Sequence, residues 1–419
     1  MKRLVVLGAG TAGTALVNRL RPRLALEEWD ITVVDRDDAH HYQPEYLFVP
    51  FNIHRAEAVA RPRRRLLADG VRFVEAAVDE VRVDSHLVEL AGGEKLSYDQ
   101  LVIASGTHPR PDQTPGLLSP EWGHTVHTFY TLDGAVALAR ALEQFRAGRL
   151  VINLVEMPVK CPPASLEFAF LVDAWLRARG RRDRVELVYA TSLSGAFTKP
   201  IASRLLGDML DERNIRLESD FYLERVDPEA RMAISYDERQ VPYDLLVTVP
   251  VNMGSDFVGR SGLGDELNHV MVDRGTFLAK GHENIFAVGD AADLPTSKAG
   301  SVAHFAVEVL VENFLKHIGG LPMPDRFDGH ANCFVETGDG KAMLIDFNYE
   351  TEPLPGTYPV PLIGPFSLLK ESRINHWGKL AFRWLYWNVL LPGRRLPLPR
   401  AMSMAGKNQP PERAGIESP

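Results

Sequence analysis

The sequence has little cysteine, no long apolar run and no excess of positive charge. Its 419 residues include only two cysteines, 172 positions apart (333 − 161), which excludes a disulfide framework and a closely spaced cysteine motif. The net charge of −8 opposes nucleic-acid binding, which usually needs a basic surface. No charge-poor apolar stretch is long enough to cross a bilayer, and a strand-like run from Leu4 leaves no room for a secretory signal. We expect a cytoplasmic protein of two or three domains.

The sequence does contain a glycine-rich turn near its N-terminus. Residues 4–13 read LVVLGAGTAG, an apolar strand that runs into Gly8, Gly10 and Gly13 and then into a helical pattern. Gly8 allows the tight turn, Gly10 the approach of a pyrophosphate, and Gly13 the close packing of helix and strand. A second strand ends at Asp35, 22 residues after Gly13 (35 − 13), where an acid accepts hydrogen bonds from a ribose. The pattern predicts a dinucleotide site at the start of the helix.

Two later segments indicate which dinucleotide binds. The segment YDQLVIASGTHPRP is a strand that ends in Ser105 and Gly106, and HENIFAVGDAADLP is a strand that ends in Gly289 and Asp290. Both resemble motifs of the flavoproteins with two dinucleotide-binding domains. There the first motif marks the return of the chain from the FAD domain, and the second places an aspartate on the ribityl chain. The resemblance implies FAD, rather than NAD, at the N-terminal site.

Between these segments the chain again alternates strands and helices, which predicts a second Rossmann-like unit inserted in the first. An enzyme that uses NAD(P)H would carry GxGxxG in the first loop of this unit, but here the loop reads EMPVKCPPA. Its side chains block the approach of a pyrophosphate, so we expect no NAD(P)H there. Pro162 and Pro163 suit a helix start, which would place Cys161 at the helix N-terminus beside Lys160. Both features favour a thiolate, and hence a reactive cysteine.

Five features together resemble the sulfide:quinone oxidoreductase family. They are HHYQP (40–44), the glycine-free MPVKCPPA (157–164), GDAADLPTSKAG (289–300), CFVETGDGKAMLIDF (333–347) and a basic, aromatic C-terminus. The resemblance implies a redox-active pair, Cys161 and Cys333, beside the flavin. Hydrosulfide attacks one of the two sulfurs and leaves a persulfide there, although which cysteine carries it stays open. Two electrons then pass through FAD to a quinone, and a sulfur acceptor takes the sulfane sulfur.

The same resemblance assigns further residues to the site. Gln43 and Lys298 match family positions that contact the flavin, and Val78 would present its backbone to the adenine. Many bacterial members carry a third cysteine, often attached to FAD, where this chain has WGHTVHTFYT with His124 and His127. We therefore expect noncovalent FAD, and no metal site.

Residues 366–400 combine aromatic and basic side chains. They contain seven Lys or Arg and one Glu, a local net charge of +6 (7 − 1), and three of the six tryptophans. The following residues would form a broad helical face, with Lys379 and Arg383 outside it: Trp377, Leu380, Ala381, Trp384, Tyr386 and Trp387. This pattern is typical of a helix that lies on a membrane surface, although a helix docked on the protein's own core shares it.

We accordingly predict an α/β protein with two Rossmann-like domains, one inserted in the other. The predicted division is as follows: FAD-binding domain 1–112 and 252–328, second domain 113–251, C-terminal region 329–400 with a strand pair and amphipathic helices, and tail 401–419, disordered over its last residues. The protein should lie peripherally on the cytoplasmic side of a membrane, and a homo-oligomer is compatible with the sequence.

Three other functions remain open. A type II NADH:quinone dehydrogenase is opposed by the missing second glycine loop. A sulfide dehydrogenase that passes electrons to a cytochrome subunit is opposed by the missing secretory signal and by the amphipathic C-terminus. A flavin-bound redox sensor with little turnover would also use paired cysteines.

Overall fold

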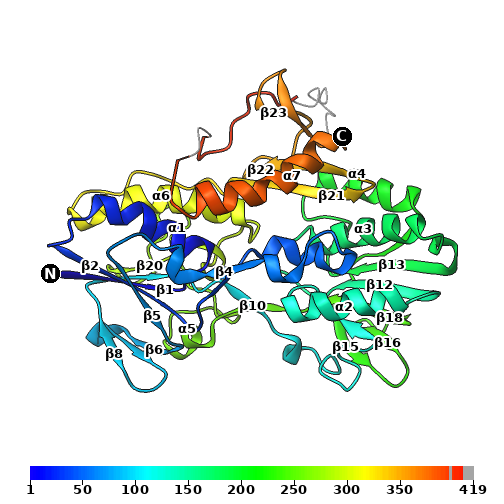
Figure 1. The fold of residues 1–419 in the computed structure, drawn as a ribbon, viewed down its shortest axis with the longest axis horizontal. Coiled ribbons are helices and arrows are strands. Elements are labelled where there is room, and N and C mark those ends of the chain that lie inside the picture. The colour runs from blue at the N-terminus through cyan, green and yellow to red at the C-terminus, as the bar shows by residue number, and fades with distance from the viewer. Residues whose placement is uncertain (396–398, 409–419) are drawn as a thin grey trace, which may run out of the picture.

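The computed structural model describes residues 1–395 and 399–408 and contains two parallel sheets that lie side by side (Figure 1). The first sheet has the strand order β20-β9-β1-β2-β5. Its strands are β1 Lys2–Leu7, β2 Trp29–Asp35, β5 Val71–Glu75, β9 Gln100–Ile103 and β20 Ile285–Ala287. Helices α1 (Thr11–Leu20) and α6 (Gly300–Ile318) pack together on one face. Strand β1 is apolar and buried from Leu4 to Leu7, as is typical of strands in parallel sheets.

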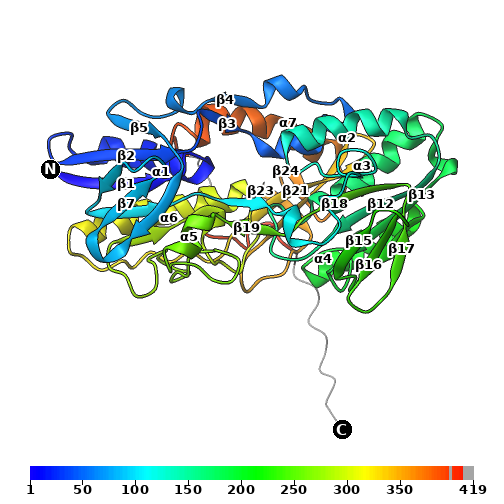
Figure 2. The same ribbon diagram turned by 90° about the horizontal axis from the view of Figure 1, so that it is seen from below.

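The second sheet is also fully parallel, with the order β11-β18-β12-β13-β14. Its strands are β11 Val126–His127, β12 Gly148–Leu154, β13 Val185–Thr191, β14 Ile215–Glu218 and β18 Leu245–Val249. The helices of this domain are α2 Leu132–Gln144, α3 Ala164–Ala178 and α4 Pro200–Glu212. These elements confirm the predicted α/β class with two Rossmann-like units. A small antiparallel sheet lies at the outer end of the domain (Figure 2), formed by β15 Leu223–Asp227, β16 Met232–Ser235 and β17 Gln240–Pro242.

Short elements complete the two domains. They are β3 Ala39–His41, β4 Ala60–Pro62, β6 Val78–Arg82, β7 Leu87–Leu90, β8 Lys95–Ser97, β10 Thr107–Pro109, β19 Asn252–Gly254 and α5 Asp256–Arg260. Strands β10 and β19 pair with each other where the chain passes between the domains. The extended loop between β3 and β4 contains short 3-10 helices, including Gln43–Leu47 and Val49–Phe51.

The C-terminal region forms a four-stranded sheet, β21-β22-β24-β23, which extends the predicted strand pair by two strands. Its strands are β21 Ala331–Gly338, β22 Lys341–Phe347, β23 Gly356–Val360 and β24 Gly364–Leu368. Helix α7 (Arg373–Leu385) follows and lies across both domains in Figure 1, where a π-helical turn, Tyr386–Leu390, continues it. Ser372 caps α7, since its side chain accepts a hydrogen bond from the Asn375 backbone N–H at 3.0 Å.

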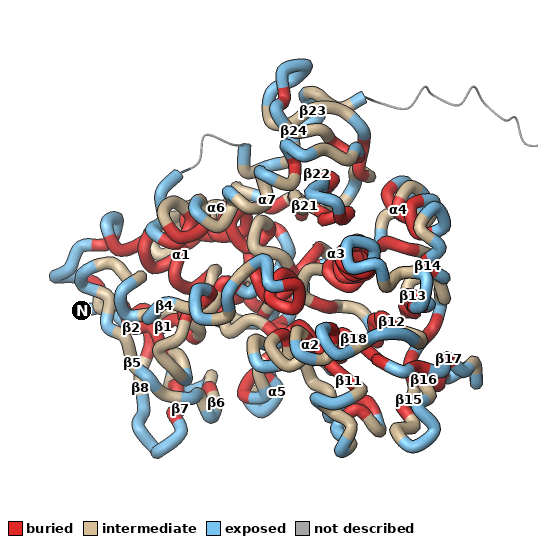
Figure 3. The backbone as a smooth tube through the Cα atoms, turned by 45° about the vertical axis from the view of Figure 1, so that its right-hand side comes forward, coloured by how far each residue is buried: buried red, intermediate tan, exposed pale blue. Residues whose placement is uncertain are grey.

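Helix α3 is buried on nearly all sides (Figure 3), because it is packed between the second sheet and β21. This position explains why its apolar residues are not confined to one stripe. Residues 401–408, which the sequence assigned to a tail, lie against the C-terminal sheet. The Thr357 N–H donates to the Gly406 carbonyl at 2.9 Å, and Lys407 Nζ lies 2.5 Å from Asp346 Oδ2. The disordered tail expected over residues 409–419 lies outside the described residues.

Candidate active site

The turn after β1 has the shape of a phosphate cradle. Gly8 has φ +110°, and a Cβ added there would lie 2.4 Å from the Ala104 carbonyl oxygen. A Cβ on Gly13 would lie 1.9 Å from the Gly8 carbonyl oxygen. A Cβ on Gly10, the N-cap of α1, would meet nothing within 4 Å among the described residues. The turn therefore presents open space in front of the first N–H groups of a helix, which fits a pyrophosphate.

Asp35 ends β2 beside this turn. Its Oδ2 accepts a hydrogen bond from the Ala9 N–H at 2.8 Å and lies 3.1 Å from Arg63 Nη1. Burial raises the pKa of Asp35, and the Arg63 guanidinium opposes that rise. Val78, the predicted adenine contact, is the first residue of β6. It follows Glu75 by three residues, and Glu75 pairs with Asp35 in the first sheet. The two residues therefore lie at the same edge, where a dinucleotide binds in such sheets.

The other predicted cofactor residues follow the ends of β9 and β20. The Ser105 hydroxyl is buried and has no hydrogen-bond partner within the described part of the chain. Gly106 has φ +67°, and Gly289 has φ +71°. A Cβ on Gly289 would lie 3.0 Å from the Ala12 Cβ, so this turn brings Asp290 to the start of α1. The buried Ser105 hydroxyl lies beside the cradle and could form a hydrogen bond with a ligand there, which fits FAD at this site.

Two lysines and Gln43 gather around Asp290. Lys298 Nζ donates to the carbonyl oxygens of Asp290 at 2.8 Å and Ala292 at 3.1 Å, and Lys160 Nζ donates to Gln43 Oε1 at 2.9 Å. Burial raises the pKa of Asp290, and the two ammonium groups oppose this rise. Burial also lowers the pKa of Lys160 to about 8. The structure thus brings together Gln43, Asp290 and Lys298, which the resemblance assigned to the flavin site, with Lys160, the neighbour of Cys161.

The two cysteines come together where α3 packs against β21. Cys161 lies three residues before α3 with φ +48°, and its N–H donates to the Lys298 carbonyl at 2.7 Å. Cys333 lies on β21 and is among the groups that raise the pKa of Cys161, and both cysteines are free thiols in the structure. The fold therefore brings together two residues that the sequence separates by 172 positions (333 − 161).

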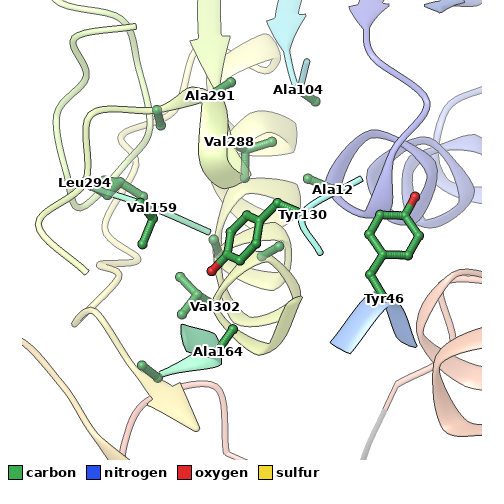
Figure 4. Packing of buried hydrophobic residues seen from close by; sticks show 14 of the residues in the cluster. Ala12, Tyr46, Ala104, Tyr130, Val159, Ala164, Val288, Ala291, Leu294 and Val302 are labelled. Atoms are coloured by element: carbon green, nitrogen blue, oxygen red, sulfur yellow. The ribbon is translucent and has the colours of Figure 1, made fainter. Parts of the chain in front are cut away.

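Tyr130 supports the turn that carries Cys161. Its hydroxyl donates to the Lys160 carbonyl at 2.7 Å. Figure 4 shows the ring between Val159 and Val302, at the junction of the two domains. Tyr130 belongs to the segment that contains His124 and His127. His127 is buried and its Nε2 lies 2.9 Å from the His124 carbonyl oxygen, which is a local structural contact.

The expectation of a thiolate at Cys161, stabilised by Lys160, was wrong for this environment. Burial raises the pKa of the Cys161 thiol, and the Glu167 carboxylate adds to the rise. Burial likewise raises the pKa of Cys333 to about 12. Lys160 extends to Gln43 rather than to the thiols. The cation that lowers the pKa of both thiols is instead Lys379, on α7.

Helix α7 carries three basic residues on its inner face, and each pairs with a buried carboxylate. His376 Nδ1 lies 3.0 Å from Glu336 Oε2, and Arg383 Nε lies 3.0 Å from Glu45 Oε1. Lys379 forms an ion pair with Glu167. Lys379 and Arg383 lie outside the face that carries the exposed Trp377 and Trp384, as the sequence predicted. The positions 376, 379 and 383 fall on one helical face. From this spacing the sequence could have predicted that the three basic side chains point in the same direction.

The outer face of α7 is apolar and exposed. Trp377 is 71% exposed and Trp384 is 64% exposed, and Ile374 lies near them in sequence with 54% exposure. Leu362 and Ile363, at the tip of the β23–β24 hairpin, are also exposed. No helix among residues 1–395 and 399–408 is long and apolar enough to cross a membrane.

Tyr386 and Trp387 are buried, so the predicted aromatic face is divided between the surface and the core. The Tyr386 hydroxyl lies 2.6 Å from His40 Nε2 and 2.8 Å from Thr11 Oγ1, and His40 Nδ1 lies 3.0 Å from the Ala9 carbonyl oxygen. Burial lowers the pKa of His40 to about 3. The neutral ring must donate from Nδ1 to the carbonyl, so Nε2 accepts from Tyr386. This network connects the end of α7 to the phosphate cradle.

Comparison with known proteins agrees with this geometry. The family model described as pyridine nucleotide-disulphide oxidoreductase matches residues 2–308. The chain belongs to this family. It is therefore an oxidoreductase, and the family implies that it binds a flavin. This agrees with the cradle at the start of α1.

The motif resemblance is confirmed by individual relatives. The chain is 25% identical over 397 residues to the mitochondrial sulfide:quinone oxidoreductase of Mus musculus, covering 93% of this chain and 86% of that protein. It is 24% identical over 415 residues to the sulfide-quinone reductase of Aquifex aeolicus, covering 93% and 91%. The X-ray structure of sulfide:quinone oxidoreductase from Aquifex aeolicus shares the fold, with a TM-score of 0.78, 21% identity, and coverage of 94% of this chain and 92% of that one.

Proposed function

We propose that this chain oxidises hydrosulfide and passes the electrons to a membrane quinone through a redox pair formed by Cys161 and Cys333. One observation carries the proposal. The turn that would hold NAD(P)H phosphates contains no glycine and carries Cys161, whose N–H donates to the Lys298 carbonyl, next to α3, which packs against the strand β21 that carries Cys333. The names of the relatives support this substrate pair.

In the proposed reaction, hydrosulfide attacks one sulfur of a Cys161–Cys333 disulfide. The bond between the two cysteine sulfurs breaks, a new sulfur–sulfur bond forms a persulfide on the attacked cysteine, and the other cysteine leaves with the electron pair as a thiolate. FAD, when bound, supplies the two-electron exchange between sulfur and quinone. A sulfur acceptor removes the sulfane sulfur and allows the disulfide to form again.

The residues of this chain have separate roles in that proposal. The turn with Gly8, Gly10 and Gly13 holds the pyrophosphate, and Asp35 the ribose. The remaining cofactor contacts are Gln43, Val78, Ser105, Gly106, Gly289, Asp290 and Lys298. FAD is bound noncovalently, because the only two cysteines of the chain form the redox pair.

We also propose that the protein lies peripherally on the cytoplasmic side of a membrane. The support is the exposure of Ile374, Trp377 and Trp384 on α7 and, separately, of Leu362 and Ile363 at the tip of the hairpin. Tryptophan side chains favour the level of the lipid headgroups, and quinones are dissolved in the bilayer. The predicted domain division and a homo-oligomeric state stay predictions.

An anaerobic titration tests the proposal. Purified protein with bound flavin is mixed first with sulfide and, in a separate sample, with NADH, and the flavin absorbance is followed. Sulfide should bleach the flavin and NADH should leave it oxidised. Bleaching by NADH alone would overturn the proposal and favour an NADH dehydrogenase.

A further inference from the structure

The segment of residues 399–408, which we call the strap, lies along the edge of the C-terminal sheet and has no role in the reaction as described so far. In Figure 1 it runs, in red, beside β23. Lys407 pairs with Gly356 in an antiparallel bridge, and the Asn408 N–H donates to the Pro355 carbonyl at 2.8 Å. The strap therefore extends the four-stranded sheet at β23, its edge strand.

Lys407 brings a buried ammonium group to this sheet. The side chains of Lys407 and Asp346 are each 1% exposed, and Nζ lies 2.5 Å from Oδ2. The other carboxylate oxygen, Oδ1, lies 2.8 Å from His330 Nε2. His330 Nδ1 lies 3.3 Å from the carbonyl oxygen of Arg400 in the strap, and Phe305 of α6 stacks on the histidine ring with the ring centroids 4.1 Å apart. The strap, the sheet and α6 therefore meet at one buried histidine.

This cluster adjoins the strand that carries the second cysteine. Asp346 on β22 is paired with Asn332 on β21, the residue before Cys333, and Asn332 Nδ2 donates to Asp346 Oδ1 at 3.4 Å. From the other side, the Ser301 hydroxyl at the start of α6 donates to the Asn332 carbonyl at 2.7 Å. The start of β21 is thus held between the Asp346 carboxylate and α6.

The start of β21 needs such a restraint. Cys333 is only the third residue of the strand, and residues 321–330 before it, all of them described, form no helix or strand. The ends of a strand open more easily than its centre. A disulfide forms only when the two Cα atoms lie about 4.4–6.8 Å apart and the side chains are directed at each other. An opening at the start of β21 would therefore separate Cys333 from Cys161.

We propose that the strap positions Cys333 for disulfide formation with Cys161, and that Lys407 is the positioning residue through which it acts. The proposal rests on the proposed redox role of the two cysteines. Burial alone would raise the pKa of Asp346, but its contacts with His330 and Lys407 hold that pKa below its ordinary value, so the carboxylate stays ionised. Without Lys407, this buried carboxylate must admit water or take up a proton. Either change weakens its hold on the start of β21.

The first test measures how well the two thiols are positioned. Protein with bound FAD is equilibrated anaerobically with mixtures of reduced and oxidised glutathione, free thiols are alkylated, and the Cys161–Cys333 disulfide is quantified by mass spectrometry. Each disulfide formed converts one oxidised glutathione into two reduced ones, so the equilibrium constant reports the effective concentration of one thiol at the other. In Lys407→Met this constant should fall about tenfold, the size of a coupling between neighbours in one network, which corresponds to about 30 mV.

Four further variants separate the strap from general effects of substitution. Lys407→Arg keeps the charge, so its equilibrium constant should fall by less, and Lys341→Met, at the exposed opposite end of β22, should match wild type. Gly406→Ala displaces the strap without removing a charge, because Gly406 has φ +80° and a Cβ there would lie 2.5 Å from the Thr357 carbonyl oxygen. It should therefore lower the constant as Lys407→Met does. Gly320→Ala is the matched control, with φ +70° and no atom of the described residues within 4 Å of the added Cβ.

Hydrogen exchange is a second readout, and it needs no disulfide. In Lys407→Met and Gly406→Ala, the backbone amides of residues 329–335 should exchange faster by about tenfold, because the start of β21 opens more often. The amides of α3, which follows Cys161, should keep their wild-type exchange rates.

The outcomes separate two failures. If wild type forms no Cys161–Cys333 disulfide at any glutathione ratio, the redox pair of the proposed function is wrong and this inference falls with it. If the disulfide forms with the same equilibrium constant in wild type, Lys407→Met and Gly406→Ala, the strap has no positioning role and the proposed function stands. Faster exchange throughout the chain would also overturn the inference, because it indicates general destabilisation. If Lys407→Met does not fold, Gly406→Ala decides the question by the same criteria.

Discussion

Replacing Lys379 by methionine should destabilise the protein by about 3–5 kcal/mol, the usual cost of leaving one charge of a buried ion pair without its partner. The Lys379 side chain is 13% exposed and that of Glu167 is 1% exposed, so water cannot replace the ammonium group at Glu167. The Phe334 carbonyl loses its donor as well. Methionine keeps the apolar stem of lysine, so the loss reflects the charge rather than the packing.

The matched control is the double variant Glu167→Gln with Lys379→Met. It removes both charges and keeps an amide oxygen that can accept from the Glu336 N–H, so it should recover at least about 2 kcal/mol relative to Lys379→Met. The measurement is a urea denaturation series of wild type, Lys379→Met, Glu167→Gln and the double variant, with FAD at the same excess, because bound ligand adds to stability. A double variant as unstable as Lys379→Met would refute the ion-pair reasoning.

Three further predictions concern the cysteines, the outer surface of α7 and the cofactor cradle. Cys161→Ser and Cys333→Ser should each abolish bleaching of the flavin by sulfide while the flavin stays bound; bleaching that survives in either would remove that cysteine from the reaction. Trp377→Gln with Trp384→Gln should release the protein in a sedimentation assay with anionic vesicles, while soluble quinone analogues are still reduced; Tyr236→Gln, at an exposed tyrosine beside β16, is the control. Tyr386→Phe removes the hydroxyl that lies between His40 and Thr11. Its affinity for FAD, measured by equilibrium dialysis, should fall by a few-fold to about tenfold, which corresponds to roughly one neutral hydrogen bond. An unchanged affinity would mean that α7 does not support the cradle.

Local patterns predicted candidate cofactor residues that lie near one another in the structure, because these residues follow strands in fixed register. Gly8, Gly10 and Gly13 lie in one turn, and Asp35 ends the next strand, so sequence spacing and spatial position agree. The sulfur side was predicted only in part. Cys161 and Cys333 were paired by resemblance, since no local rule brings positions so far apart together.

The charges at the sulfur side could not be predicted from the sequence, for a physical reason. Lys160 adjoins Cys161 in the chain, but successive side chains of an extended turn point in different directions, and this one extends to Gln43. The lysine that faces the thiols comes from α7, and its partner Glu167 lies 212 positions earlier. The basic and aromatic pattern predicted a helix on a membrane surface, but the carboxylates that its cations meet lie far away in the chain, so the sequence did not reveal them.

Helix α7 therefore reverses the usual arrangement of an amphipathic helix on a globular domain. Its inner face is held by His376, Lys379 and Arg383, each paired with a buried carboxylate, while its tryptophans face outward. Apolar packing allows a helix to rotate or slide at little cost, whereas the contacts of His376 and Lys379 with buried carboxylates are hydrogen bonds, which depend on direction and restrict that rotation. A fixed rotation directs the exposed tryptophans to one side. The same helix then carries the surface proposed to meet the membrane and the lysine that pairs with Glu167, so a change that loosens its inner face should affect both.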